Sequence, residues 1–110
     1  MIKKDDFYNS WLYLNNLECI FYKGINHFYE CLDIEVVKVN PETNEIDDDN
    51  SKNTKTQVWL EFGGITYDET FKCLMGIHDI DLDCGADTFE EAIIELAYLC
   101  KVNGYKERGN

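Results

Sequence analysis

The chain has 110 residues and a formal net charge of -12, and 45% of its residues are hydrophobic and 14% aromatic. A disordered acidic chain contains far fewer apolar side chains, so we expect one folded domain, residues 1–110, with its charge on the surface of a packed core. The negative field repels nucleic acid and anionic membranes, which disfavours direct binding to either and favours basic partners.

The first third of the chain predicts a helix and then a strand. Apolar residues recur at helical spacing over 3–17, which indicates a helix. Residues 19–28 fit a strand or a buried turn, and we leave them open. Residues 29–39 alternate and are rich in β-branched side chains, which predicts a strand with Leu32, Ile34 and Val36 on one side and Asp33 and Glu35 on the other.

The middle of the chain predicts a long loop and a second strand. Residues 40–55 contain the single proline and almost no apolar side chain, so we expect an exposed acidic loop. Alternation resumes over 56–62, with Val58, Leu60 and Phe62 on one side, and predicts a strand antiparallel to the first. Residues 65–76 show no regular pattern.

The last third predicts an acidic strand and a helix. Residues 77–84 alternate between acidic and mostly apolar side chains, which indicates a strand. Thr88 and Glu91 then match a capping box, which places a helix start there, and Gly104 is positioned to end that helix. These patterns together predict an α+β fold, a small antiparallel sheet of about three to four strands with an N-terminal and a C-terminal helix packed on one face.

The run HDIDLDCG carries the most specific signal. In a strand, Asp79, Asp81 and Asp83 leave the same face about 6.8 Å apart. Phosphates of a DNA strand follow one another every 3.4 Å or so along the helix axis, and farther apart through space because the backbone winds. The similar spacing predicts a surface that imitates nucleic acid.

Alternation places further acids and a tryptophan on the same solvent-facing side of the sheet. Trp59 is the expected anchor for a partner, because tryptophan is enriched among the residues that dominate binding energy. Two alternatives stay open: the charge only keeps the protein soluble, and Trp59 only packs under a loop. The predicted partner-binding residues are Asp33, Glu35, Trp59, Glu61, Asp79, Asp81 and Asp83.

Other site chemistries fit the sequence poorly. Asp79 to Glu90 matches several ligand positions of an EF-hand calcium loop, but Cys84 stands where the loop needs glycine. The five cysteines and two histidines lack the paired spacing of zinc ligands. The number of cysteines is odd and no CxxC pair is present, which indicates reduced thiols. We therefore expect no catalytic residue, no cofactor and no metal.

The segment HDIDLDCGADTFEEAIIELA resembles uncharacterised small acidic proteins of phages and mobile elements of low-GC Gram-positive bacteria. Inhibitors of host defence, including anti-CRISPRs and DNA mimics, are a recurrent type among such proteins. The resemblance covers about a fifth of the chain and implies a context of action more than a mechanism.

The leading hypothesis is a non-catalytic inhibitor that binds a basic nucleic-acid-binding protein of a bacterial defence system, a nuclease or a CRISPR effector. The absence of a long apolar run and of a signal sequence leads us to expect the cytoplasm, that of the host cell if a phage encodes the protein. An immunity protein against a nuclease toxin uses the same electrostatics, and a calcium-binding module or a small assembly protein are further alternatives. The oligomeric state stays open.

Overall fold

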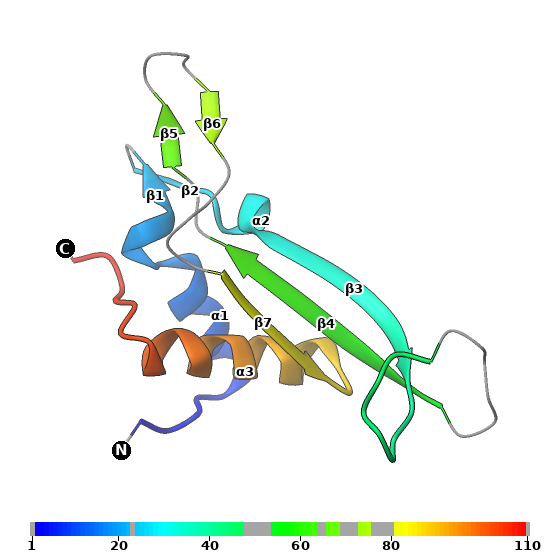
Figure 1. Ribbon diagram of the computed structural model, residues 1–110. Coiled ribbons are helices and arrows are strands. Elements are labelled where there is room, and N and C mark those ends of the chain that lie inside the picture. Colours follow the sequence, from blue (N-terminus) through cyan, green and yellow to red (C-terminus); the bar gives the residue numbers. More distant parts are fainter. Residues whose placement is uncertain are drawn as a thin grey trace.

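Figure 1 shows the computed structural model of the chain, which describes residues 2–22, 24–47, 54–63, 66–68, 73–75 and 81–109. No helix in these ranges is long and apolar enough to cross a membrane. The helical elements are α1 (Phe7–Asn15), the 3-10 turn η1 (Glu18–Ile20), α2 (Phe28–Cys31) and α3 (Phe89–Val102). The strands are β1 (Phe21–Tyr22), β2 (Ile25–Asn26), β3 (Leu32–Val39), β4 (Lys55–Gly63), β5 (Thr66–Asp68), β6 (Cys73–Met75) and β7 (Asp81–Ala86).

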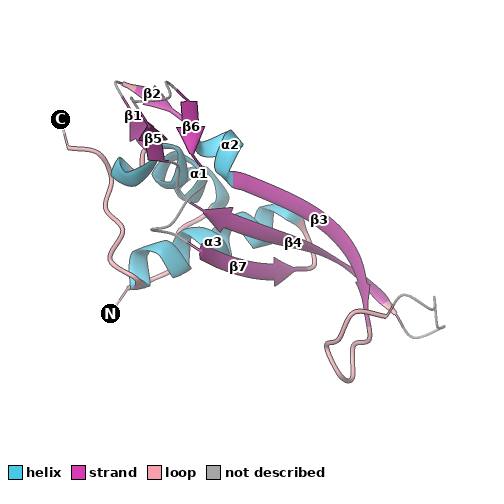
Figure 2. Cartoon of the chain, turned by 45° about the horizontal axis from the view of Figure 1, so that its top comes forward, coloured by secondary structure: helices cyan, strands magenta, loops and turns pink. Residues whose placement is uncertain are grey.

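The central sheet confirms the predicted α+β fold. Among the described strands it has the order β3–β4–β7, and both pairs are antiparallel. The C-terminal helix α3 packs on β7 and β4, and the N-terminal helix α1 packs against α3 (Figure 2). Both predicted helices and all three predicted strands are therefore present, with shifted ends.

Local hydrogen bonds explain where the two long helices begin. The Asp6 carboxylate accepts from the Asn9 backbone N–H at 2.8 Å, so α1 begins at Phe7 and not at residue 3. The Thr88 hydroxyl accepts from the Glu91 N–H at 3.1 Å, and α3 begins at the next residue, as the capping box predicts.

The core lies between the sheet and the two helices. Phe28 is fully buried, and its ring lies 5.5 Å from that of Phe62 and 5.4 Å from that of Trp11. The fully buried residues of the core cluster come from α1 and the turn after it, from α2, from β4 and from α3: Leu14, Leu17, Ile20, Phe28, Leu60, Phe62, Ala92, Ile93, Leu96, Ala97 and Cys100.

Two short hairpins and one helical turn differ from the predictions. Residues 29–31, predicted as strand, belong to α2, because the Asn26 side chain accepts from the Phe28 N–H at 2.6 Å and the Phe28 ring turns into the core. The open stretch 19–28 contains the pair β1 and β2, with Gly24 at φ 83° between them. The stretch 65–76, predicted as irregular, contains the pair β5 and β6.

Both chain ends lie along the helices. Gly104, at φ 84°, ends α3, and the tail then pairs with the segment after α1 through Leu17 and Glu107. The Tyr13 hydroxyl donates to the Tyr105 carbonyl, which holds the tail against α1. The N-terminal segment is joined to α3 by ion pairs of Lys4 with Glu95 and of Asp5 with Lys101.

The helices leave Ile34 and Val36 on the apolar side of β3 uncovered, which the sequence did not predict, whereas Leu32 on the same side packs against the core. Ile34 and Val36 share a face with the buried Leu60 and Phe62, yet they are 54% and 64% exposed. The reason is the position of α3, which lies over β7 and β4 and does not cover the outer strand.

The cap of α3 gives a first test of this fold. Thr88→Ala removes the acceptor for the Glu91 N–H and should lower the free energy of unfolding by about 1 kcal/mol. Thr88→Ser keeps a hydroxyl and should stay within a few tenths of a kcal/mol of the parent in urea denaturation. Equal losses in the two variants would contradict the capping assignment.

Candidate functional site

Carboxylates from all three strands of the central sheet line up on the face opposite the helices. Glu61 of β4 pairs with Asp33 of β3 on one side and with Asp83 of β7 on the other. Neighbouring strands lie about 4.8 Å apart, so the three side chains form a row across the sheet. We call Asp33, Glu35, Glu61, Asp83 and Trp59 the acidic face; together they line an open hollow of about 620 Å³.

These carboxylates have no basic partner within the described ranges. The ion pairs there are Lys4–Glu95, His27–Glu30, Lys55–Asp87 and Lys101–Asp5, and none of them includes a carboxylate of the acidic face. Lys55 lies on the same side of β4 but its ammonium is 3.5 Å from Asp87. Like charges placed directly opposite one another destabilise a sheet, so the row has an electrostatic cost.

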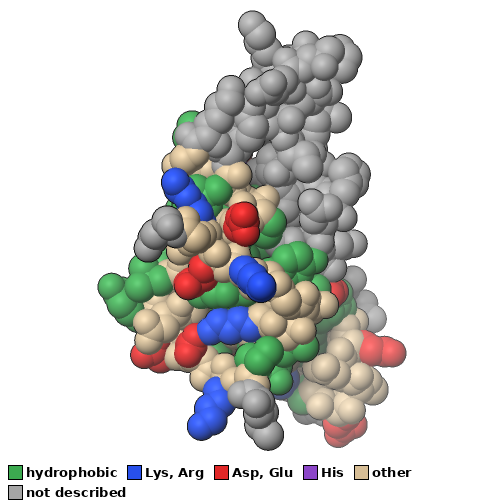
Figure 3. All heavy atoms as spheres, turned by 90° about the vertical axis from the view of Figure 1, so that its left-hand side faces the viewer, with side chains coloured by type: hydrophobic (Ala, Val, Ile, Leu, Met, Phe, Trp, Pro, Cys, Tyr) green, Lys and Arg blue, Asp and Glu red, His purple; other side chains and the backbone are tan. Residues whose placement is uncertain are grey.

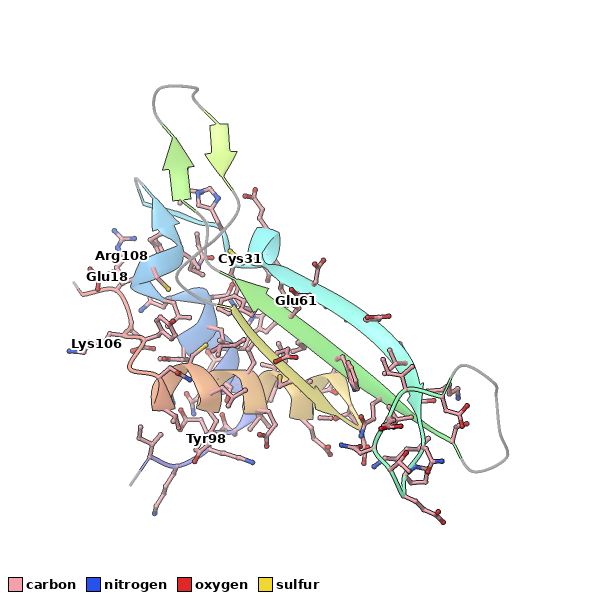
Figure 4. The ribbon with its side chains drawn as sticks, in the orientation of Figure 1. Glu18, Cys31, Glu61, Tyr98, Lys106 and Arg108 are labelled. Atoms are coloured by element: carbon pink, nitrogen blue, oxygen red, sulfur yellow. The ribbon has the colours of Figure 1, made fainter. Side chains whose placement is uncertain are left out.

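Basic side chains gather instead at the chain ends. Figure 4 shows Lys106 and Arg108 on the C-terminal tail at the left-hand margin, away from Glu61 on the central sheet. On the surface that carries the two termini, Lys and Arg side chains alternate with acidic and apolar ones (Figure 3). The Arg108 guanidinium lies 4.6 Å from the centre of the Phe21 ring, so part of this charge is packed against the protein itself. The acidic face thus carries carboxylates without a basic partner in the described part of the chain, whereas the surface at the termini carries charges of both signs.

Trp59 lies on the acidic face, as alternation predicts, but it is packed and not free. It stands opposite Gly85 of β7, and a Cβ on Gly85 would be 2.6 Å from Cδ1 of the indole. The indole N–H donates to the Gln57 side chain at 3.0 Å. Trp59 is thus a half-buried wall of the hollow, held by its neighbours.

Two of the predicted site residues are described in part or not at all. Asp79 lies outside the described residues. Asp81 is the first residue of β7 and pairs with Gly63, and its side chain is not described. The structure brings together the other five: Asp33, Glu35, Trp59, Glu61 and Asp83.

Sequence reasoning missed Gln57 and Gly85, which hold the indole of Trp59. A glycine inside a strand indicates close approach of another group, so Gly85 carried a usable signal. Gln57 is almost fully buried, and no local pattern indicated this.

The structure gives little support to the calcium and thiol alternatives. Residues 81–86 form an extended strand, whereas an EF-hand loop folds around its ion. Burial raises the pKa of Cys84 to about 11, with Glu95 and Asp83 adding to the effect, and raises that of Cys31 and Cys100 to about 12. These three thiols are protonated at neutral pH and are poor nucleophiles.

Comparisons of the chain with protein-family models, with curated proteins and with solved structures found no match. The resemblance of residues 78–97 to small phage proteins stays a prediction.

The contact between Gly85 and Trp59 should be sensitive to one methyl group. Gly85→Ala forces the indole to move and should lower the free energy of unfolding by about 1 to 3 kcal/mol. In a Trp11→Phe background the same change should shift the fluorescence maximum of Trp59. Gly109→Ala is the control, because a Cβ there meets no atom within 4 Å. It should leave the free energy of unfolding and the fluorescence maximum unchanged.

Removing the central charge of the row should not harm the fold. Glu61→Gln relieves repulsion from both neighbours, so stability should stay equal or rise by up to about 1 kcal/mol. Glu90→Gln, in the first turn of α3, should instead lower stability slightly because a carboxylate there interacts favourably with the helix dipole. A large loss of stability for Glu61→Gln in thermal unfolding would show that the carboxylate is needed for folding.

Proposed function

We propose that the protein is a non-catalytic inhibitor that binds a basic, nucleic-acid-binding protein of a bacterial defence system through its acidic face. The observation that carries the proposal is the row Asp33–Glu61–Asp83, whose carboxylates have no basic partner in the described part of the chain. A row that costs stability is retained when an external partner supplies the missing positive charge.

The dimensions of the face suit a channel that holds a phosphate backbone. Acids lie about 4.8 Å apart across strands and about 6.8 Å apart along a strand, spacings comparable to those of successive phosphates. Nucleases and CRISPR effectors line such channels with lysine and arginine, which bind phosphates without regard to base sequence. An array of carboxylates can therefore occupy the channel in place of nucleic acid, and the proposed site of action is the cytoplasm, where these proteins act.

Trp59 adds a rigid apolar wall to this face. Its contact with Gly85 and its hydrogen bond to Gln57 hold the indole before any partner arrives, so little side-chain entropy is lost on binding. The indole supports the proposal because arginine side chains pair with carboxylates and also stack on aromatic rings.

The test is inhibition of a panel of purified CRISPR effectors, restriction endonucleases and nuclease toxins. The protein should block DNA cleavage by at least one of them and should compete with DNA for binding, more weakly as salt rises because the interaction is screened. Neutralising the acidic face with Asp33→Asn, Glu35→Gln, Glu61→Gln and Asp83→Asn should raise the inhibitory concentration about 100-fold.

A matched variant separates the effect of the acidic face on inhibition from the effect of net charge. Glu18→Gln, Glu42→Gln, Glu90→Gln and Glu107→Gln remove the same charge from exposed sites elsewhere and should leave inhibition nearly unchanged. Inhibition of no panel member, equal losses in the two variants, or a target that binds the protein and DNA together would each contradict the proposal. Inhibition confined to nuclease toxins would assign the protein as an immunity protein.

A further inference from the structure

Within the described part of the chain, the outer edge of β3 has no strand partner along most of its length. The strand pairs with β4 on its inner side, and no described strand pairs with its outer side over 32–37. Natural sheets protect such edges with charged side chains, proline or a covering loop. The stretch 32–37 contains no proline, and its two charged residues, Asp33 and Glu35, are both acidic, so they disfavour acidic partners and not basic ones.

One end of this edge already accepts an added segment of the chain itself. The Asp47 N–H donates to the Lys38 carbonyl and the Asn40 N–H to the Glu45 carbonyl, both at 2.8 Å, and Ile46 forms a bridge with Val39. These bonds show that the backbone groups of Lys38 face outward. Because every second residue of a strand points to the same edge, the N–H and C=O groups of Ile34 and Val36 face outward as well.

The side chains beside this edge differ between the two faces of the sheet. On the helix side, Ile34 and Val36 are apolar and more than half exposed. On the other side, Asp33 and Glu35 belong to the acidic face. An added strand would therefore contact apolar side chains on one face and carboxylates on the other.

The charge decides between a second copy and a different partner. Pairing of two β3 edges extends both sheets, so the carboxylates of the two copies would share one face, and each copy has a net charge of -12. A strand with basic side chains on that face would instead neutralise Asp33 and Glu35.

We propose that the outer edge of β3 accepts an extended segment of the basic partner as an additional strand, in which basic and apolar side chains alternate. Main-chain hydrogen bonds to Ile34 and Val36 supply affinity, and the alternation supplies specificity, as in other cases of strand addition. The basic character of the segment rests on the proposed function, whereas the open edge and its apolar side do not.

The test uses two synthetic peptides of equal composition, blocked at both ends. The first alternates, Lys-Val-Lys-Val-Lys-Val-Lys, and the second is in blocks, Lys-Lys-Lys-Lys-Val-Val-Val. Titration of isotope-labelled full-length protein, followed by NMR, should show the alternating peptide binding at least about tenfold more tightly. Amide exchange at Ile34 and Val36 should slow in its complex. Equal affinity of the two peptides, or unchanged exchange at these amides, would overturn the proposal.

Two variants of the edge make the test specific. Val36→Pro removes an outward N–H, which an edge strand tolerates, and the double variant Ile34→Thr, Val36→Thr keeps β-branched side chains but removes apolar contact. Each variant should bind the alternating peptide about tenfold or more weakly than the parent does. Thermal unfolding of each variant checks that it is folded. Retention of full affinity by both would overturn the proposal. A dimer of the free protein that Val36→Pro abolishes would also overturn it, since a second copy would then be the occupant.

The panel of defence proteins separates this proposal from the proposed function. If inhibition needs the acidic face but Val36→Pro inhibits like the parent, the edge proposal fails and the proposed function stands. If the alternating peptide binds at β3 but no panel member is inhibited, the proposed function fails and the edge proposal stands.

Discussion

The packing of α3 on the central sheet is the contact on which the rest of the molecule depends. Ile93 and Leu96 of α3 and Leu60 and Phe62 of β4 are buried in one cluster. A helix with its side chains is about 10 Å wide and strands are about 4.8 Å apart, so one helix covers about two strands. Because α3 lies over β4 and β7, Ile34 and Val36 of β3 stay exposed. Alternation directs Asp33, Glu61 and Asp83 to the opposite face.

Local patterns in the sequence predict α1, α3 and the three strands of the central sheet, but not α2 or the two short hairpins. Alternation assigns Asp33, Glu61 and Asp83 to one side, but it cannot say that they stand opposite one another, because register depends on how the strands pair. The exposure of Ile34 and Val36 likewise depends on where the helix layer ends. The turn of α2 escaped prediction because it depends on one hydrogen bond, from the Phe28 N–H to the Asn26 side chain, and on the burial of Phe28.

Charge is distributed asymmetrically between the sheet face and the helix side of the molecule. Acids on the sheet face have no basic partners among the described residues, whereas Lys4 and Lys101, on the helix side, are each paired with an acid. Such an asymmetric field orients a basic partner toward the sheet during its approach and raises the association rate. The indole of Trp59 stands opposite Glu35 of β3, so a partner oriented in this way meets the indole beside the outer strand.

The most direct test of this account is carbodiimide labelling of carboxylates, analysed by mass spectrometry, on the free protein and on its complex with an inhibited defence protein. We expect labelling of Asp33, Glu61 and Asp83 to fall strongly in the complex, while Glu18, Glu90 and Glu107 react as in the free protein. Protection of the second set, with the first still reactive, would show that the partner binds the helix side and would contradict the account.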